Sequence, residues 1–87
     1  MNDSLLQLRD QIDNADKKLI AALAERFTVV AQIKAYKKEH HVPALDQNRY
    51  ESMITDRKKL GEAHGLSPAL IAAIFTAIHD HSLKQQL

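Results

Sequence analysis

Six polar side chains of this sequence stand on or beside helical faces that would otherwise be apolar. They are Arg9, Arg26, Lys37, Arg49, Ser82 and Gln86. A guanidinium group binds a carboxylate through two parallel hydrogen bonds, and lysine, serine and glutamine add single donors. Together the six indicate a pocket for a small, dianionic, oxygen-rich molecule.

Arg26 carries the strongest signal because it interrupts an apolar stripe. Within residues 5–38, "LLQLRDQIDNADKKLIAALAERFTVVAQIKAYKK", apolar residues recur at helical spacing. The stripe consists of Leu5, Leu8, Ile12, Ala15, Leu19, Ala22, Val29, Ile33 and Tyr36. An unpaired charge within such a stripe is costly, so Arg26 needs either a carboxylate, which Glu25 or Asp46 could offer, or a bound anion.

Helical spacing separates the cations into two groups. Arg26 and Lys37 are eleven residues apart, which is about 16 Å along one helix face and close enough for two long side chains to converge. Arg9 lies about 25 Å from Arg26 along the same helix. We therefore expect an antiparallel partner helix to bring Arg9 from a second chain into range.

Taken singly, the members of this set other than Arg26 also fit ordinary surface positions. Arg9 is flanked by Asp10 and Asp13, and Lys37 adjoins Lys38, as on solvated helix faces. Arg49 fits the same interpretation, and the two polar residues near the C-terminus also fit a helix end where the core thins out. The residues alone leave both interpretations open.

Three helices are expected to position these residues. The first covers residues 5–38, with Ser4 as its N-cap and Gln7 reaching back in a capping box. Pro43 in "EHHVPAL" ends or offsets that helix. A second helix is expected from about Asp46, as N-cap, to His64, with Met53 and Leu60 on its inner face.

The third helix is expected to follow a short break. Gly65 suits a left-handed C-cap, and Ser67 followed by Pro68 suits the start of a helix. Its apolar stripe runs through Ile71, Phe75 and Ile78 and, continued, reaches Ser82 and Gln86. No segment has the alternation of a strand, so the sequence predicts an all-α fold.

The length of the first helix predicts a homodimer. A helix over residues 5–38 would be roughly 50 Å long, whereas a compact chain of this size is about 30 Å across. One chain therefore cannot cover the stripe, and exposed apolar surface of this extent favours a two-fold dimer through intertwined long helices.

Composition narrows the functional classes. The 87 residues contain no cysteine and carry a net charge of +1, which favours one domain over residues 1–87 and argues against a general nucleic-acid or membrane binder. The absence of a leader or a membrane-spanning run predicts a cytoplasmic protein. Neither His40–His41 nor His79–His81 shares a helix face as metal ligands at i and i+4 would, so no metal site is predicted.

One segment imitates a DNA-binding motif. "LGEAHGLSPALIAAIF" has a glycine at the turn between two helices, like a helix-turn-helix. Its would-be recognition helix begins "PALIAAIF" and offers no side chain that reads base edges. We therefore favour the small-anion pocket over a DNA-binding dimer.

The order of three segments resembles the all-helical class of chorismate mutase (type II) over essentially the whole chain. These are "LLQLRDQIDNADKKLIAALAER", "IKAYKKEHHVPALDQNRYE" and "HGLSPALIAAIFTAIHDHSLKQQ". The resemblance implies an intertwined homodimer of long, short and medium helices. It also implies an isomerase that rearranges chorismate to prephenate in aromatic amino acid biosynthesis, without a cofactor.

The resemblance assigns roles to individual residues. Arg9 in "LRDQID" matches the arginine supplied by the partner subunit, and Arg26 and Arg49 match those that bind substrate carboxylates. Lys37 and Gln86 match the two catalytic donors to the substrate's ether oxygen. These would stabilise the negative charge that develops on that oxygen as the bond breaks.

The stretch around Asp46 contains a departure from the family. Asp46 and Ser82 match pocket residues near the ring hydroxyl and a carboxylate. Where the family usually has Arg-Glu, this chain has Arg49-Tyr50, which changes how the ring substituent would be recognised. Relatives of the same fold act as isochorismate-pyruvate lyase or aminodeoxychorismate mutase and diverge here, so both remain alternatives, although Asp46 favours the mutase.

Overall fold

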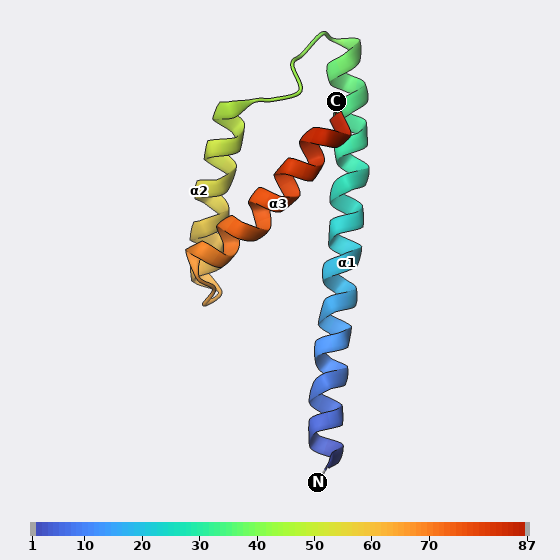
Figure 1. Ribbon diagram of the computed structural model, residues 1–87, viewed down its shortest axis with the longest axis vertical. Coiled ribbons are helices and arrows are strands. Elements are labelled where there is room, and N and C mark those ends of the chain that lie inside the picture. Colours follow the sequence, from blue (N-terminus) through green and yellow to red (C-terminus); the bar gives the residue numbers. More distant parts are fainter. Residues whose placement is uncertain (1, 87) are drawn as a thin grey trace.

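Residues 2–86 are described by a computed structural model that contains three helices joined by two short connections (Figure 1). Helix α1 spans Asn2–Glu39, α2 spans Gln47–Ala63 and α3 spans Pro68–Gln86. This part of the chain contains no strand. The predicted all-α class and the long, short, medium order are confirmed.

Helix α1 begins earlier than the sequence suggested. It already includes Asn2 and Asp3, so Ser4 lies inside the first turn and the predicted capping box with Gln7 is wrong. The acidic Asp3 suits the first turn, where the helix dipole favours negative charge. No glycine or proline follows before Pro43, so nothing interrupts the 38 residues.

The end of α1 turns sharply at a histidine. The Val42 amide donates to the Lys37 carbonyl at 2.8 Å, while His41 takes a positive φ of 57°. This six-to-one hydrogen bond closes the last turn in the manner of a Schellman motif. Pro43 then carries the chain away from the helix toward α2.

The ends of α2 follow local sequence signals. The Asp46 carboxylate accepts from the Arg49 amide at 2.9 Å and caps the first turn, as predicted. At the other end the Leu66 amide donates to the Gly61 carbonyl at 2.8 Å, and Gly65 has a φ of 77°. Gly65 is therefore the left-handed residue that was predicted there.

Helix α3 packs against both other helices, whereas α2 and α1 do not pack directly on each other in the described part of the chain (Figure 1). Its start is capped as predicted, because Ser67 Oγ accepts from the Leu70 amide at 3.0 Å. The buried apolar side chains are Val30, Met53 and Ile71, one from each helix. The core of the described chain is therefore small.

Close approach of α2 and α3 occurs at Gly61. A Cβ atom added there would overlap the Ile71 side chain, so a residue without a side chain is required. The predicted inner position of Leu60 is wrong for the single chain, where that side chain is 58% exposed. Consecutive residues of a helix are rotated by about 100° about its axis. Because Gly61 faces α3, Leu60 points away from that contact.

The molecule is elongated, with extents of 60 × 23 × 16 Å and a radius of gyration of 16.7 Å. The N-terminal half of α1 extends beyond the α2–α3 pair (Figure 1). Its stripe is open to solvent, with Leu8, Ile12 and Leu19 each 55–59% exposed. One chain does not cover its own stripe, as the length argument predicted, and the homodimer stays a prediction.

Candidate functional site

One cavity of about 150 Å³ brings most of the predicted residues together. It lies between the C-terminal half of α1, the start of α2 and the C-terminal half of α3, and we call it the site cavity. Seven predicted residues line it: Arg26, Lys37, Asp46, Arg49, Tyr50, Ser82 and Gln86. The cavity fits a small molecule, and Arg9 does not line it.

Helical spacing explains how distant residues reach this cavity. On α1, Arg26, Val30 and Lys37 succeed one another at intervals of four and seven residues and therefore share a face. On α3, Ser82 and Gln86 are four residues apart and do the same. The cavity is therefore the place where two polar interruptions of apolar stripes face each other.

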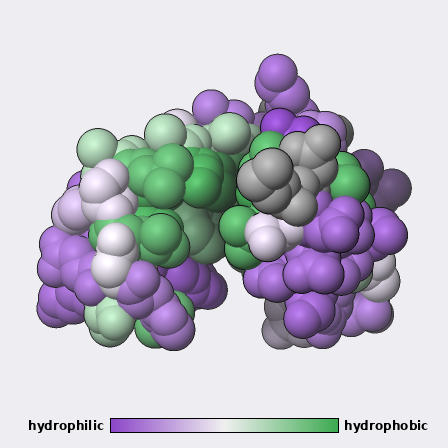
Figure 2. All heavy atoms as spheres, turned by 90° about the horizontal axis from the view of Figure 1, so that it is seen from below, coloured by the Kyte–Doolittle hydropathy of each residue, from purple (hydrophilic) through white to green (hydrophobic). Residues whose placement is uncertain are grey.

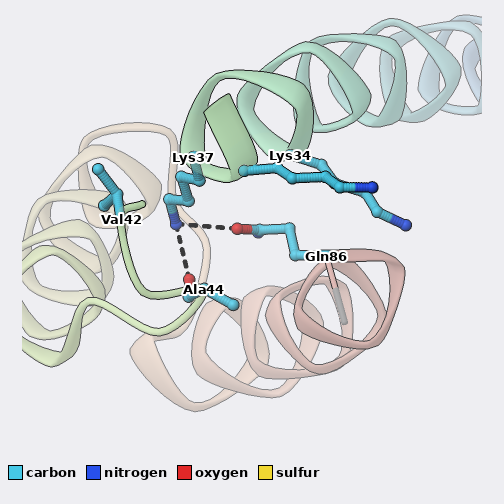
Figure 3. Close-up of a pocket in the computed structure, with 6 residues that line it drawn as sticks. Lys34, Lys37, Val42, Ala44 and Gln86 are labelled. Carbon is cyan, nitrogen blue, oxygen red and sulfur yellow. Dashed lines mark hydrogen bonds between the residues drawn. The ribbon is translucent and has the colours of Figure 1, made fainter. Parts of the chain in front are cut away.

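Lys37 is held in place by two acceptors. Its Nζ donates to Gln86 Oε1 at 2.8 Å and to the Ala44 carbonyl at 2.6 Å (Figure 3). An ammonium group has three donors, so one remains for a ligand. Ala44, in the connection between α1 and α2, is a contact that the sequence did not reveal because the acceptor is main chain.

Gln86 presents a donor to the same place. Its side-chain oxygen accepts from Lys37, which leaves its NH₂ group with two donors. The Lys37 ammonium and the Gln86 amide thus form a pair of donors at one end of the site cavity. Such a pair can stabilise negative charge on one oxygen atom of a bound molecule.

Arg26 is fixed by Ser82. Its Nη1 donates to Ser82 Oγ at 3.1 Å, and Ser82 Oγ donates in turn to the Ile78 carbonyl at 2.9 Å. Ser82 is only 5% exposed, so this polar residue is part of the packed interface between α1 and α3. Neither Glu25 nor Asp46 supplies the hydrogen bond that holds Arg26.

Burial and neighbouring cations both act on Arg26. Desolvation lowers its pKa, and the positive charges of Arg57 and Arg49 lower it further. All three guanidinium groups also line an adjoining cavity of about 330 Å³, together with Glu25. Converging cations are mutually unfavourable, so a bound anion would stabilise this arrangement.

Arg57 was missed in the sequence. The signal that could have revealed it is its position four residues after the buried Met53, on the inner face of α2. His79 was missed too, although it precedes Ser82 by three residues and lines the site cavity. In the sequence, His79 was considered only together with His81 as a metal ligand. The face of α3 that His79 shares with Ser82 was not considered.

Tyr50 contributes its ring to the site cavity. Its hydroxyl lies 3.2 Å from Thr76 Oγ1 on α3. Its ring centroid lies 4.1 Å from that of His79, with the two planes tilted by 46°. Tyr50 and His79 thus line the cavity as a packed aromatic pair.

A larger cavity of about 370 Å³ shares Lys37, Ala44 and Gln86 with the site cavity, and Figure 3 shows its lining residues. It is also lined by Lys34, Lys38 and Val42, and by no arginine. The guanidinium groups of Arg26 and Arg49, which have the geometry for bidentate hydrogen bonds to a carboxylate, line the smaller cavity instead.

The described residues form neither a metal site nor a membrane-spanning helix. Among residues 2–86, no three histidine or acidic side chains come together in a way that could hold a metal ion. No helix in that range is long and apolar enough to cross a membrane. The arrangement found is one of cations and neutral donors around a small cavity.

This fold and this site define an all-helical protein with cations and neutral donors around a small cavity, and comparison with known proteins identifies its family. Residues 8–87 match the family described as chorismate mutase type II. The chain therefore belongs to that family, as the resemblance of its three segments suggested.

Curated relatives agree with this assignment. The chain is 38% identical over 82 residues to the T-protein of Enterobacter agglomerans. It is 34% identical over 82 residues to the bifunctional chorismate mutase/prephenate dehydratase of Escherichia coli (strain K12). These alignments cover 94% of this chain but only 22% and 21% of the relatives. The chain thus spans about a fifth of their length.

A third relative has a different printed activity. The 4-amino-4-deoxychorismate mutase of Streptomyces pristinaespiralis is 29% identical over 76 residues, which are 87% of this chain and 59% of the relative. The chain is therefore also similar to a protein named for a substrate with an amino group in place of a hydroxyl.

Proposed function

We propose that this protein catalyses the rearrangement of chorismate to prephenate in the site cavity. The observation that carries the proposal is the placement of Lys37 and Gln86 as paired donors in one cavity with Arg26 and Arg49. Membership of the chorismate mutase type II family supports it.

The chemistry fits the residues present. In this rearrangement the ether C–O bond breaks while a C–C bond forms within the same molecule, and no proton or electron enters or leaves. The protein needs only to hold the reactive conformer and to stabilise charge that develops on the ether oxygen. The third donor of Lys37 and the amide of Gln86 supply that stabilisation.

The substrate's two carboxylates account for the arginines. Arg26, held by Ser82, offers its remaining guanidinium donors to one carboxylate. Arg49 projects from the first turn of α2 into the same cavity and serves another carboxylate oxygen. Asp46, whose carboxylate also caps that turn, would lie near the ring hydroxyl.

We further propose that the site is completed by a second copy of the chain. Viewed from the N-terminal end of α1, an open groove separates α1 from the α2–α3 pair, and hydrophobic side chains gather on both sides of it (Figure 2). An antiparallel α1 from a partner would cover this surface and the exposed stripe. It would also bring the partner's Arg9 toward Arg26.

The direct test supplies the purified protein with chorismate and, separately, isochorismate. We expect rapid formation of prephenate from chorismate, measured by the loss of the ultraviolet absorbance of chorismate and by chromatography of the product. Pyruvate and salicylate from isochorismate, with little prephenate from chorismate, would instead identify a lyase and overturn the proposal.

A second candidate is supported by the Streptomyces relative. Rearrangement of 4-amino-4-deoxychorismate would use the same donors and arginines, because the two substrates differ only at ring carbon 4. Comparing the two substrates at equal concentration separates these activities. The cytoplasmic location and the absence of nucleic-acid partners stay predictions.

A further inference from the structure

The group that receives the ring substituent of the substrate is left open by the arginines, Lys37 and Gln86. Tyr50 is one candidate, because it follows Arg49 in the sequence and lines the cavity. Its hydroxyl, however, is 3.2 Å from Thr76 Oγ1. Thr76 does not line the site cavity, so the polar end of Tyr50 is engaged outside it.

Beside Asp46, whose carboxylate accepts from the Arg49 amide, His79 is the second polar group at this part of the cavity wall. The Tyr50 ring packs against it at a centroid distance of 4.1 Å. The two nitrogens of an imidazole lie in the plane of its ring, so packing against a ring face does not occupy them. Tyr50 thus acts as a support that fixes His79, while His79 keeps its hydrogen-bonding atoms.

The position of His79 suits the end of a substrate that is remote from the ether oxygen. His79 precedes Gln86 by seven residues on the same face of α3, or about 10 Å along the helix. Asp46 lies one turn before Tyr50 on α2, next to the same corner. The corner is therefore formed by Asp46, Tyr50 and His79.

The charges of the cavity wall favour a neutral substituent there. Arg26, Lys37 and Arg49 are cationic and Asp46 is anionic, and all four line the cavity. Their net charge of +2 balances two carboxylates. The partner's Arg9 would add further positive charge, and the Asp46 carboxylate already accepts from the Arg49 amide, so a protonated amine on the substrate ring would be disfavoured.

We propose that His79, held by the Tyr50 ring and its hydrogen bond to Thr76, is the residue that recognises the ring hydroxyl and selects it over an amino group. This inference rests on the proposed function, because it concerns the specificity of the same site. It assigns Tyr50 and Thr76 to positioning and not to substrate contact.

The test measures kcat and KM for chorismate and for 4-amino-4-deoxychorismate with the full chain. We expect the wild-type protein to prefer chorismate. His79→Leu should lower kcat/KM for chorismate about tenfold, the loss expected for one hydrogen bond to a substrate, with a smaller effect on the amino substrate. His79→Gln, which keeps a donor and an acceptor, should retain most of the activity.

Introducing a negative charge at residue 79 gives a second test of the proposal. His79→Glu places a carboxylate at the corner and should move the ratio of kcat/KM values toward the amino substrate by at least tenfold. Tyr50→Phe and Thr76→Val should each reduce the preference for chorismate about threefold. The double variant should show no greater loss than either alone, because both remove the same hydrogen bond.

His81→Leu is the matched control, since His81 lies two residues further along α3, is exposed and packs on Phe27 outside the cavity. This substitution should leave kcat/KM for both substrates unchanged. Circular dichroism and thermal unfolding verify that each variant is folded.

Two results would overturn the proposal in different ways. If the wild-type protein turns over neither substrate, the proposed function fails and the assignment of His79 fails with it. The wild-type protein could instead be active, with His79→Leu and His79→Glu changing kcat/KM for both substrates by the same factor. In that case the function stands and His79 does not determine specificity.

Discussion

Lys37 is the residue on which the proposed chemistry depends most. Its ammonium group is fixed by the Ala44 carbonyl and by Gln86, and its third donor is free to meet a developing negative charge. We expect Lys37→Ala to lower kcat by at least about 100-fold, as loss of one donor of this kind does. Steady-state kinetics with chorismate measures the change.

Lys34 provides the control for that substitution. It lies three residues earlier on α1 and lines the adjoining larger cavity, but it does not line the site cavity. Lys34→Ala should therefore have nearly wild-type kcat. A near-normal rate for Lys37→Ala would remove Lys37 from the mechanism.

The three guanidinium groups of Arg26, Arg49 and Arg57 lead to a prediction about anions. Burial, and then the charges of Arg57 and Arg49, lower the pKa of Arg26, so the charged guanidinium is disfavoured there without a bound anion. We expect malonate, a small dicarboxylate, to raise the thermal midpoint more than sodium chloride of equal ionic strength. Differential scanning fluorimetry gives the comparison.

Substitution of Arg57 tests whether positive charge near Arg26 causes the stabilisation by malonate. Arg57→Gln should raise the thermal midpoint of the ligand-free protein and reduce the further gain from malonate. Lys59→Gln removes the same charge from an exposed position on α2 and should change neither quantity. Equal behaviour of the two variants would contradict a local effect at Arg26.

At the scale of elements, the contact between α2 and α3 depends on Gly61. We expect Gly61→Ala to lower the free energy of unfolding by about 1–2 kcal/mol, because overlap with Ile71 outweighs the helix propensity gained by alanine. The free energy of unfolding is measured by urea denaturation, with circular dichroism as the probe. The comparison is Ser52→Ala on the exposed face of α2, which should not destabilise.

The same contact can be relieved from its other side. In an Ile71→Ala background the overlapping atoms are absent, so adding Gly61→Ala should be neutral or stabilising. A cost that persists in that background would show that the overlap with Ile71 is not its source.

Helix ends and shared faces could be predicted from the sequence because they depend on residues close together in the chain. Asp46, Gly65 and Ser67 occupy the cap positions expected of them. Ser4 does not, since Asn2 and Asp3 extend the helix before it. Capping residues signal a boundary only where the preceding residues are not helical themselves.

The candidate site was predictable to the extent that it follows helical spacing. Seven of its eight predicted residues line one cavity. Three features were not predictable: the orientation of Tyr50, the presence of His79 in the cavity lining, and the nearness of Arg57 to Arg26. They depend on how α2 and α3 cross, and that crossing is set by packing between segments distant in the sequence.

At the scale of the whole molecule, the exposed stripe of α1 determines the expected assembly. We expect this chain of 9.8 kDa, whose longest extent is 60 Å, to be found in solution at twice the chain mass. Light scattering measures the mass, and Ile12→Glu with Leu19→Glu should yield monomers. Lys17→Glu with Lys18→Glu, off the stripe, should leave the dimer intact.

A shared site also predicts complementation between inactive chains. Mixing Arg9→Ala with Arg26→Ala chains would form mixed dimers in which one site has both arginines and the other has neither. Random exchange makes half of the dimers mixed, so we expect about a quarter of wild-type activity. No recovery, once exchange is demonstrated by mass spectrometry, would refute a site built across the interface.

The unbroken course of α1 restricts which changes of length the protein tolerates. One residue inserted between Arg9 and Arg26 would rotate everything before it by about 100° relative to the site and shift it by 1.5 Å. The stripe and Arg9 would then face away from the partner, although every residue type was retained. The connection after Val42 has no such constraint except where it brings the Ala44 carbonyl to Lys37. Insertions and deletions should therefore be absent between residues 9 and 37 among functional relatives and should occur in the connections instead.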